Sequence, residues 1–262
     1  MASTAGAGAL LRAGEERWRN PPEIFRLKPR REAMPVDAFW TRIEGLLAAR
    51  SALASPFVAA VESGTASRES LQRFARDLCV LANELPFVEG EIASRAALHG
   101  VDTVILLSYG ATLAFGYNGR PPLVELSRRL ARSLGAPEKG PASRRVNIYL
   151  SCLRSLGLEW LEAGVAATCV DAQWTDAAPR LKAGLAGHYG VAEADLECLD
   201  AWAAFDGPRA TERPLLVREL GQSGYHQHVI THAVRESTAV WRHMWDGWAS
   251  TPPEEDAVTA AP

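Results

Sequence analysis

The sequence has 262 residues, of which 47% are hydrophobic and 23% are charged, and its formal net charge is −3. Such a chain is long enough for one large globular domain, and it lacks the concentrated basic surface that a general nucleic-acid binder needs. No run approaches the roughly 18 consecutive apolar residues of a membrane span. The four cysteines stand singly, without the spacing of a zinc site or a disulfide framework, which favours a cytoplasmic protein.

Helical periodicity begins after an N-terminal arm. Residues 1–34 contain several proline breakers and are expected to be flexible. Phe39, Ile43 and Leu46 then fall on one face at helical spacing. This pattern predicts a first helix from Val36 to Glu62.

The same periodicity continues to the end of the chain. Ser67 is a candidate N-cap for a long second helix that extends to residue 100, in which Pro86 predicts a kink. No segment shows the alternating pattern of a β-strand. The sequence therefore predicts an all-α helical bundle in a single domain over residues 35–250, followed by a disordered tail at 251–262. The further predicted helices are 103–116, 122–135, 142–157, 158–190, 193–221 and 225–250.

The segment from Cys169 to Asp176 is unusually polar for a predicted core helix. Asp171 follows the mostly apolar residues 164–168. An ionised carboxylate in a dry interior is costly unless it is hydrogen-bonded, paired or bound to a metal. Asp171 is therefore a candidate functional residue.

Three segments resemble a known fold family. They are residues 55–86 ("SPFVAAVESGTASRESLQRFARDLCVLANELP"), 164–191 ("GVAATCVDAQWTDAAPRLKAGLAGHYGV") and 193–210 ("EADLECLDAWAAFDGPRA"). In their residues and in their order along the chain, these segments resemble the heme-oxygenase-like fold shared by thiaminase II, the pyrroloquinoline quinone synthase PqqC and the diiron oxidases. The resemblance covers roughly Val36 to Trp248. It implies a helical bundle that receives a small-molecule substrate, and it suggests a homodimer.

The resemblance also indicates which residues of this chain correspond to the metal ligands of the diiron oxidases, the metal-binding branch of this fold family. A Glu-x-Gln motif of that branch lies where this chain has Asp171 and Gln173. A His-xxx-Asp-xx-His motif lies where it has Trp202, Asp206 and Arg209, so only the middle ligand is retained. Asp171 then either holds substrate, a proton or a metal, or forms a structural ion pair with Arg209.

An early helix of the metal-binding branch supplies a Glu and a His. The nearest candidates here are Glu84 and Glu91, which are seven residues apart and share a helix face. An iron site would depend on the carboxylates of Glu84, Glu91, Asp171 and Asp206, whereas a diiron centre normally takes imidazole ligands as well. The alternative is chemistry without a cofactor, as in PqqC. Both non-heme iron and no cofactor therefore remain open.

A second group of candidates lies in the last predicted helix. Tyr225, His228 and His232 stand at i, i+3 and i+7, so they share one face. They either perform acid-base work, with a His228–His232 spacing that could also hold a metal, or are surface or helix-terminal groups.

Two core residues also have two interpretations. Trp202 either fills the space of a lost metal ligand or stacks on a flat substrate. Cys169 either packs in the core or matches the nucleophilic cysteine of thiaminase II, whose substrate-anchoring aspartate resembles Asp77 by position.

Together these residues predict an enzyme of specialised metabolism. It would carry out an O₂-dependent oxidation, or a related transformation, of a small organic metabolite in a central cavity, with no nucleic-acid or membrane partner. The alternatives are a non-catalytic member of the fold that binds a ligand or a partner protein, and a thiaminase-like hydrolase that uses Cys169. The predicted catalytic residues are Asp171, Asp206, Arg209, Tyr225 and His228. The predicted substrate contacts are Glu84, Gln173, Trp202 and His232.

Overall fold

A computed structural model describes residues 32–98, 115–116, 121–138, 140–159 and 161–250, with only the backbone described at 96–98, 158–159 and 205–216. The described elements are α2 (Val36–Ala49), η2 (Ala52–Ala54), α3 (Pro56–Glu62), α4 (Arg68–Leu98), α6 (Leu123–Ser133), α7 (Arg144–Glu159), α8 (Leu161–Ala167), η3 (Thr168–Gln173), α9 (Trp174–Tyr189), η4 (Glu193–Asp195), α10 (Glu197–Leu220) and α11 (Gly224–Ala249). All are α or 3₁₀ helices, which confirms the predicted all-α fold.

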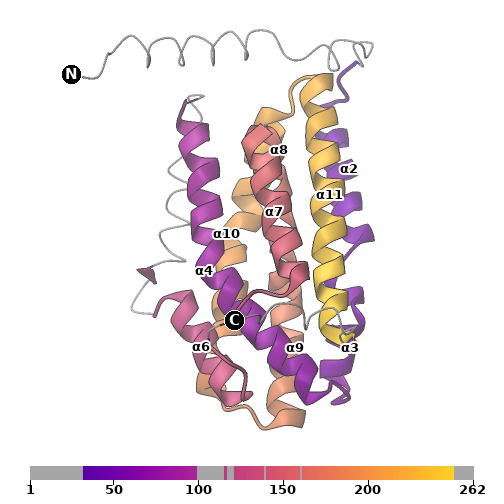
Figure 1. Cartoon of the computed structure of the whole chain (residues 1–262). Coiled ribbons are helices and arrows are strands. Elements are labelled where there is room, and N and C mark those ends of the chain that lie inside the picture. The colour runs from indigo at the N-terminus through magenta and orange to yellow at the C-terminus, as the bar shows by residue number, and fades with distance from the viewer. Residues whose placement is uncertain (1–31, 99–114, 117–120, 139, 160, 251–262) are drawn as a thin grey trace, which may run out of the picture.

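The long helices form a bundle (Figure 1). Helix α11 packs against α7 and α8 and also contacts α2 and α3. Helix α4 packs against α6 and α7, while α10 packs against α9 and η3. The polar segment predicted from the sequence therefore lies among the central helices.

Two glycines allow α7 and α8 to approach closely. A Cβ atom added to Gly164 would lie 2.8 Å from the Cα of Gly157. Ile92 of α4 fills the space beside both glycines, since a Cβ at Gly157 would lie 2.9 Å from its Cγ1. This contact brings the second half of α4 onto the α7–α8 pair.

The predicted first helix is wrong in its length. Helix α2 ends at Ala49, and the chain makes a short 3₁₀ turn before α3 begins at Pro56. Ser51 and Ser55 cause the interruption, because each side chain caps a new helix by accepting a backbone N–H bond. Apolar periodicity persists across the break, so it could not reveal these caps.

The predicted helix at 158–190 is also divided. Its central part, Thr168–Gln173, is a 3₁₀ segment between α8 and α9. By contrast, α4 continues through Pro86 as one helix. The tail 251–262 and most of the predicted helix at 103–116 lie outside the described residues.

No single helix among the described residues is long and apolar enough to cross a membrane. A pair bent by 42°, Val36–Ala54 with Pro56–Glu62, meets the length and composition criteria only when its two parts are taken together.

Candidate active site

Asp171 is buried in the bundle and bonded to a tyrosine. The carboxylate is 1% exposed, and its Oδ1 accepts a hydrogen bond of 2.7 Å from the hydroxyl of Tyr149, which is fully buried. Tyr149 lies on α7, and Asp171 lies in η3 at the far end of the antiparallel α7–α8 pair. The O–H···O distance is that of a well-formed hydrogen bond. Sequence reasoning missed Tyr149 as the partner.

The local backbone around Asp171 departs from the α-helix. The hydroxyl of Thr168 donates to the carbonyl of Val165 at 2.9 Å, and the thiol of Cys169 lies 3.7 Å from the same oxygen. Such side-chain bonds compete with the helical pattern of backbone bonds. A 3₁₀ stretch within a longer helix often accompanies a functional site. This one places Asp171 toward α7.

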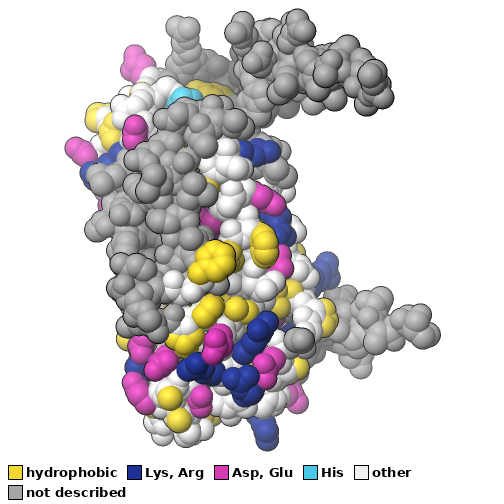
Figure 2. Space-filling view, turned by 90° about the vertical axis from the view of Figure 1, so that its left-hand side faces the viewer, with side chains coloured by type: hydrophobic (Ala, Val, Ile, Leu, Met, Phe, Trp, Pro, Cys, Tyr) yellow, Lys and Arg dark blue, Asp and Glu magenta, His cyan; other side chains and the backbone are white. Residues whose placement is uncertain are grey.

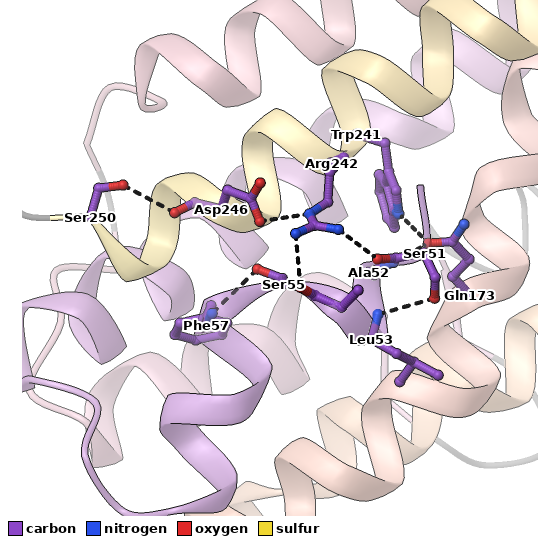
Figure 3. A network of polar contacts seen from close by, with 11 residues as sticks. Ser51, Ala52, Leu53, Ser55, Phe57, Gln173, Trp241, Arg242, Asp246 and Ser250 are labelled. Carbon is purple, nitrogen blue, oxygen red and sulfur yellow. Dashed lines mark hydrogen bonds and ion pairs between the residues drawn. The ribbon is translucent and has the colours of Figure 1, made fainter. Parts of the chain in front are cut away.

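Gln173 is held by the protein itself. Its Oε1 accepts bonds from the Ala52 amide at 2.6 Å and from the Trp241 indole at 3.1 Å, and its Nε2 donates to the Leu47 carbonyl at 3.1 Å. Figure 3 shows this amide at the junction of three segments of the chain. Arg242 joins η2 to α11 in the same network, through the carbonyl oxygens of Ser51 and Ala54. Gln173 therefore fixes η3 in place beside Asp171.

Four tryptophans form an aromatic wall next to this pair. Trp174 stacks on Trp202 with ring centroids 5.1 Å apart, and it also contacts Trp241 and Trp245. Trp241 in turn contacts the ring of Tyr149 at 5.1 Å. Within the described part of the chain, the indole nitrogens of Trp202 and Trp245 are buried without a hydrogen-bond partner. Buried donors of this kind are rare, and each could serve an acceptor on a bound molecule.

Glu89 is a buried acid that sequence reasoning missed. It is 1% exposed on α4. Leu85 and Ile92, at one-turn spacings on either side, are also buried, so Glu89 shares the face of α4 that meets the α7–α8 pair. The spacing alone could not have found Glu89, because Glu84 likewise has buried Leu81 and Val88 one turn to either side.

The structure does not bring Glu84 and Glu91 to Asp171. Glu84 is partly exposed and forms an ion pair of 2.8 Å with Arg154 of α7. Glu91 is exposed. Both therefore lie on a different face of α4 from Glu89.

Tyr225, His228 and His232 also lie away from the Asp171 pair. All three are exposed side chains on α11. His232 is nine residues before the buried Trp241, which turns it about 180° around the helix axis. His228 and His232 line a separate cleft of about 260 Å³ next to α2. Burial, with a smaller effect from Glu162, raises the pKa of Tyr225.

For two of the predicted catalytic residues, the structure describes only the backbone. Asp206 and Arg209 both belong to α10, but their side chains lie outside the description. The ion pair predicted between Asp171 and Arg209 therefore stays a prediction.

The described side chains do not fit a diiron centre. No three of their His, Cys, Asp and Glu residues are grouped so as to hold a metal ion. The interior position predicted for a histidine ligand holds Trp202, which is stacked and buried. The described histidines are all exposed or partly exposed, namely His188, His226, His228, His232 and His243. No step below is therefore assigned to iron.

A second buried aspartate, Asp77 of α4, lies apart from the Tyr149–Asp171 pair. Its Oδ2 accepts a 3.0 Å bond from the Trp248 indole, and its Oδ1 accepts a 3.2 Å bond from the Ser143 amide. Burial raises the pKa of Asp77, while these bonds and Arg76 act in the opposite direction. Both carboxylate oxygens are thus already engaged by the protein.

Known structures share this arrangement of helices. A domain with a heme oxygenase-like fold from Shewanella denitrificans matches with a TM-score of 0.63 and 10% identity, over 82% of this chain and 92% of that one. A TenA homologue from P. horikoshii matches with a TM-score of 0.57 and 16% identity, over 82% of this chain and 100% of that one. The chain has the heme oxygenase-like fold. No protein-family model matches the sequence, and no curated protein matches it significantly.

Proposed function

We propose that this protein is an enzyme that transforms a small organic metabolite within the bundle, with Tyr149 and Asp171 as its proton-handling pair. The observation that carries the proposal is the buried 2.7 Å hydrogen bond between these two side chains, in a 3₁₀ interruption of the core. A carboxyl group hydrogen-bonded to a tyrosine hydroxyl is an arrangement suited to general acid-base work. The heme oxygenase-like fold supports the proposal, since this fold is common among enzymes.

The pair can move a proton without leaving a new charge on the tyrosine. When the Tyr149 oxygen accepts a proton from a substrate, its own proton passes to Oδ1 of Asp171 along the existing hydrogen bond. The reverse transfer returns the proton to the product. General acid-base catalysis of this kind typically contributes about 10²–10⁴-fold to a rate.

We propose that an aromatic or otherwise flat substrate contacts the edge of this tryptophan cluster, whose four rings are packed on one another and 0–1% exposed. Its buried indole donors on Trp202 and Trp245 can bond to acceptors on such a molecule. We propose an O₂-dependent oxidation as the reaction class, which follows the resemblance to PqqC. Glu89, on the α4 face that meets the α7–α8 pair, is an additional candidate for contact with the substrate.

An untargeted metabolite assay can test the proposal without a known substrate. The purified protein is incubated with a small-molecule extract of its source cells, with and without dioxygen, and consumed compounds are identified by mass spectrometry. We expect the wild type to deplete at least one compound only when dioxygen is present. Asp171→Asn should slow this loss by well over tenfold while retaining the fold, because the amide is nearly isosteric and still accepts the Tyr149 bond.

Asp176→Asn is the matched control. It makes the same change in charge five residues later, at an exposed position of α9. Depletion that is equal in wild type and Asp171→Asn would contradict the catalytic role. If the wild type depletes no compound, the non-catalytic alternative replaces the proposal. Metal analysis of the same preparation, from iron-supplemented cells, should find no stoichiometric pair of irons.

A thiaminase-like hydrolysis is the second candidate. It is favoured by the position of Cys169, which is buried two residues before Asp171. In that case depletion would continue without dioxygen and Cys169→Ala would abolish it. The oxidative proposal predicts instead that Cys169→Ala retains activity.

A further inference from the structure

A second cleft, which the proposed activity does not use, opens between α4, α6 and α7. Its volume is about 570 Å³, within the usual range for sites that hold small molecules. Asp171 and Tyr149 are not among its lining residues. Figure 2 shows the face that carries α6, where basic and acidic side chains gather in the lower part below a group of apolar side chains.

The walls of this cleft are fixed by specific contacts. Arg154 of α7 pairs with Glu84 of α4 at 2.8 Å, and this bridge spans the two helices. Glu138, in the segment after α6, pairs with Arg132 at 3.0 Å. The bond from the Ser143 amide to buried Asp77 anchors the end of the connecting segment. The cleft is therefore a built feature of the fold.

Arg128 is the one lining charge that the described residues leave uncompensated. The other lining charges, Glu84, Glu138 and Arg154, all take part in the ion pairs above. Among the described residues, no ion pair includes Arg128, and its Nε is shielded from solvent without a hydrogen-bond partner. A partly buried guanidinium favours a carboxylate or phosphate, which it can bind through two parallel N–H bonds.

The remaining lining supplies polar but uncharged contacts. Asn83 and Asn147 each use the amide nitrogen in a bond within the protein, at 3.1 and 3.5 Å, so their carbonyl oxygens stay available as acceptors. Burial raises the pKa of the Cys79 thiol to about 11, which keeps it neutral. Val80 and Leu150 supply the apolar part of the lining. These neighbours suit an organic molecule better than a bare inorganic ion.

We propose that this cleft binds a small organic anion, whose carboxylate or phosphate pairs with Arg128 while its polar body contacts Asn83 and Asn147. The inference is independent of the proposed interior activity, because the two sites share no residue.

Calorimetric titration of the full chain tests the proposal. The probes are glycerate for a carboxylate source and glycerol 3-phosphate for a phosphate source, since both carry hydroxyl donors for the Asn83 and Asn147 oxygens, with inorganic phosphate as the reference ion. We expect saturable one-to-one binding of at least one organic probe, stronger than that of inorganic phosphate. Arg128→Met should weaken it about tenfold or more, since a hydrogen bond to a charged group is lost.

Arg129→Met is the matched control. Arg129 is the next residue on α6, and its guanidinium pairs with Glu125 at 2.8 Å outside the cleft lining. Its substitution removes the same charge and should leave the affinity within about twofold. Asn147→Leu keeps every charge and should weaken the organic probe while leaving inorganic phosphate unchanged.

Each result has a defined meaning. If a melting assay shows that Arg128→Met does not fold, Arg128→Lys replaces it as the test variant. This substitution keeps the charge but removes the paired N–H donors of the guanidinium, so it should still weaken binding measurably. The proposal is wrong if neither organic probe binds at millimolar concentration. It is equally wrong if Arg129→Met weakens binding as much as Arg128→Met, because attraction to the surface as a whole would then explain the result.

Discussion

Asp77 and Asp171 are the same residue type at equal depth, but their surroundings differ. Asp77 is 0% and Asp171 1% exposed, and each accepts a bond from a buried aromatic side chain. For Asp77 the donors are the indole of Trp248 and the amide of Ser143, neither of which releases its proton at physiological pH. Asp171 accepts a bond from the hydroxyl of Tyr149, which can pass its proton on only while it accepts another one.

The two regions are also built differently. Asp77 lies within a regular α-helix and joins α4 to α11 and to the segment before α7. Asp171 lies in a 3₁₀ interruption, and its partner Tyr149 contacts a tryptophan cluster in which two indole nitrogens have no partner among the described residues. A buried charge is therefore not in itself evidence of catalysis. The chemistry of its donors separates a structural acid from a candidate catalytic one.

The largest effect should come from deleting the structural acid. Asp77→Ala leaves the buried Trp248 N–H and the partly buried Ser143 N–H without their acceptor, and it should destabilise the fold by about 3 kcal/mol. Urea denaturation measures this change. Glu91→Ala, at an exposed position of the same helix, should change stability by less than about 0.5 kcal/mol. If Asp77→Ala proves as mild as Glu91→Ala, Asp77 is not the structural member of the pair.

A smaller difference should separate two buried tryptophans. Trp248→Phe removes the bond to Asp77 as well as part of the packing with Phe57 and Phe74. Trp202→Phe removes a nitrogen that has no partner among the described residues. Trp248→Phe should therefore cost about 1–2 kcal/mol more than Trp202→Phe in urea denaturation. Equal costs would mean that the Trp248 bond contributes nothing to stability.

How much of these two regions the sequence could predict depends on how far apart the contacting residues are along the chain. Apolar periodicity is a local signal, so it predicted the all-α fold and identified Asp171 as an anomaly, but it missed the breaks at Ser51–Ser55 and at Thr168–Gln173. The partners of the two aspartates are set by tertiary packing, since Trp248 is 171 residues from Asp77 in the chain. No spacing rule could supply them.

Helical register informs one of the predicted placements but not the other. Glu84 and Glu89 each have buried apolar residues one turn to either side, so only the packing of α4 against α7 and α8 separates them. The register of His232 against the apolar Trp241, by contrast, already places this histidine on the opposite face of its helix.

The smallest predicted effect is a dependence on pH that belongs to Asp77 alone. Burial raises its folded-state pKa above the ordinary value of 3.8, so the folded chain holds this proton more tightly than the unfolded chain does. The contribution of the group to stability is thus fully present below the unfolded pKa and is lost as pH rises through the folded pKa. Asn at position 77 cannot titrate. The difference in unfolding free energy between the wild type and Asp77→Asn therefore removes the pH dependence that the other acids contribute to both proteins. Urea denaturation of both proteins should therefore show that the unfolding free energy of the wild type increases relative to that of Asp77→Asn as pH falls from 7 toward 4. If the wild type instead loses stability relative to Asp77→Asn on acidification, the Trp248 and Ser143 bonds outweigh burial and lower the pKa of Asp77.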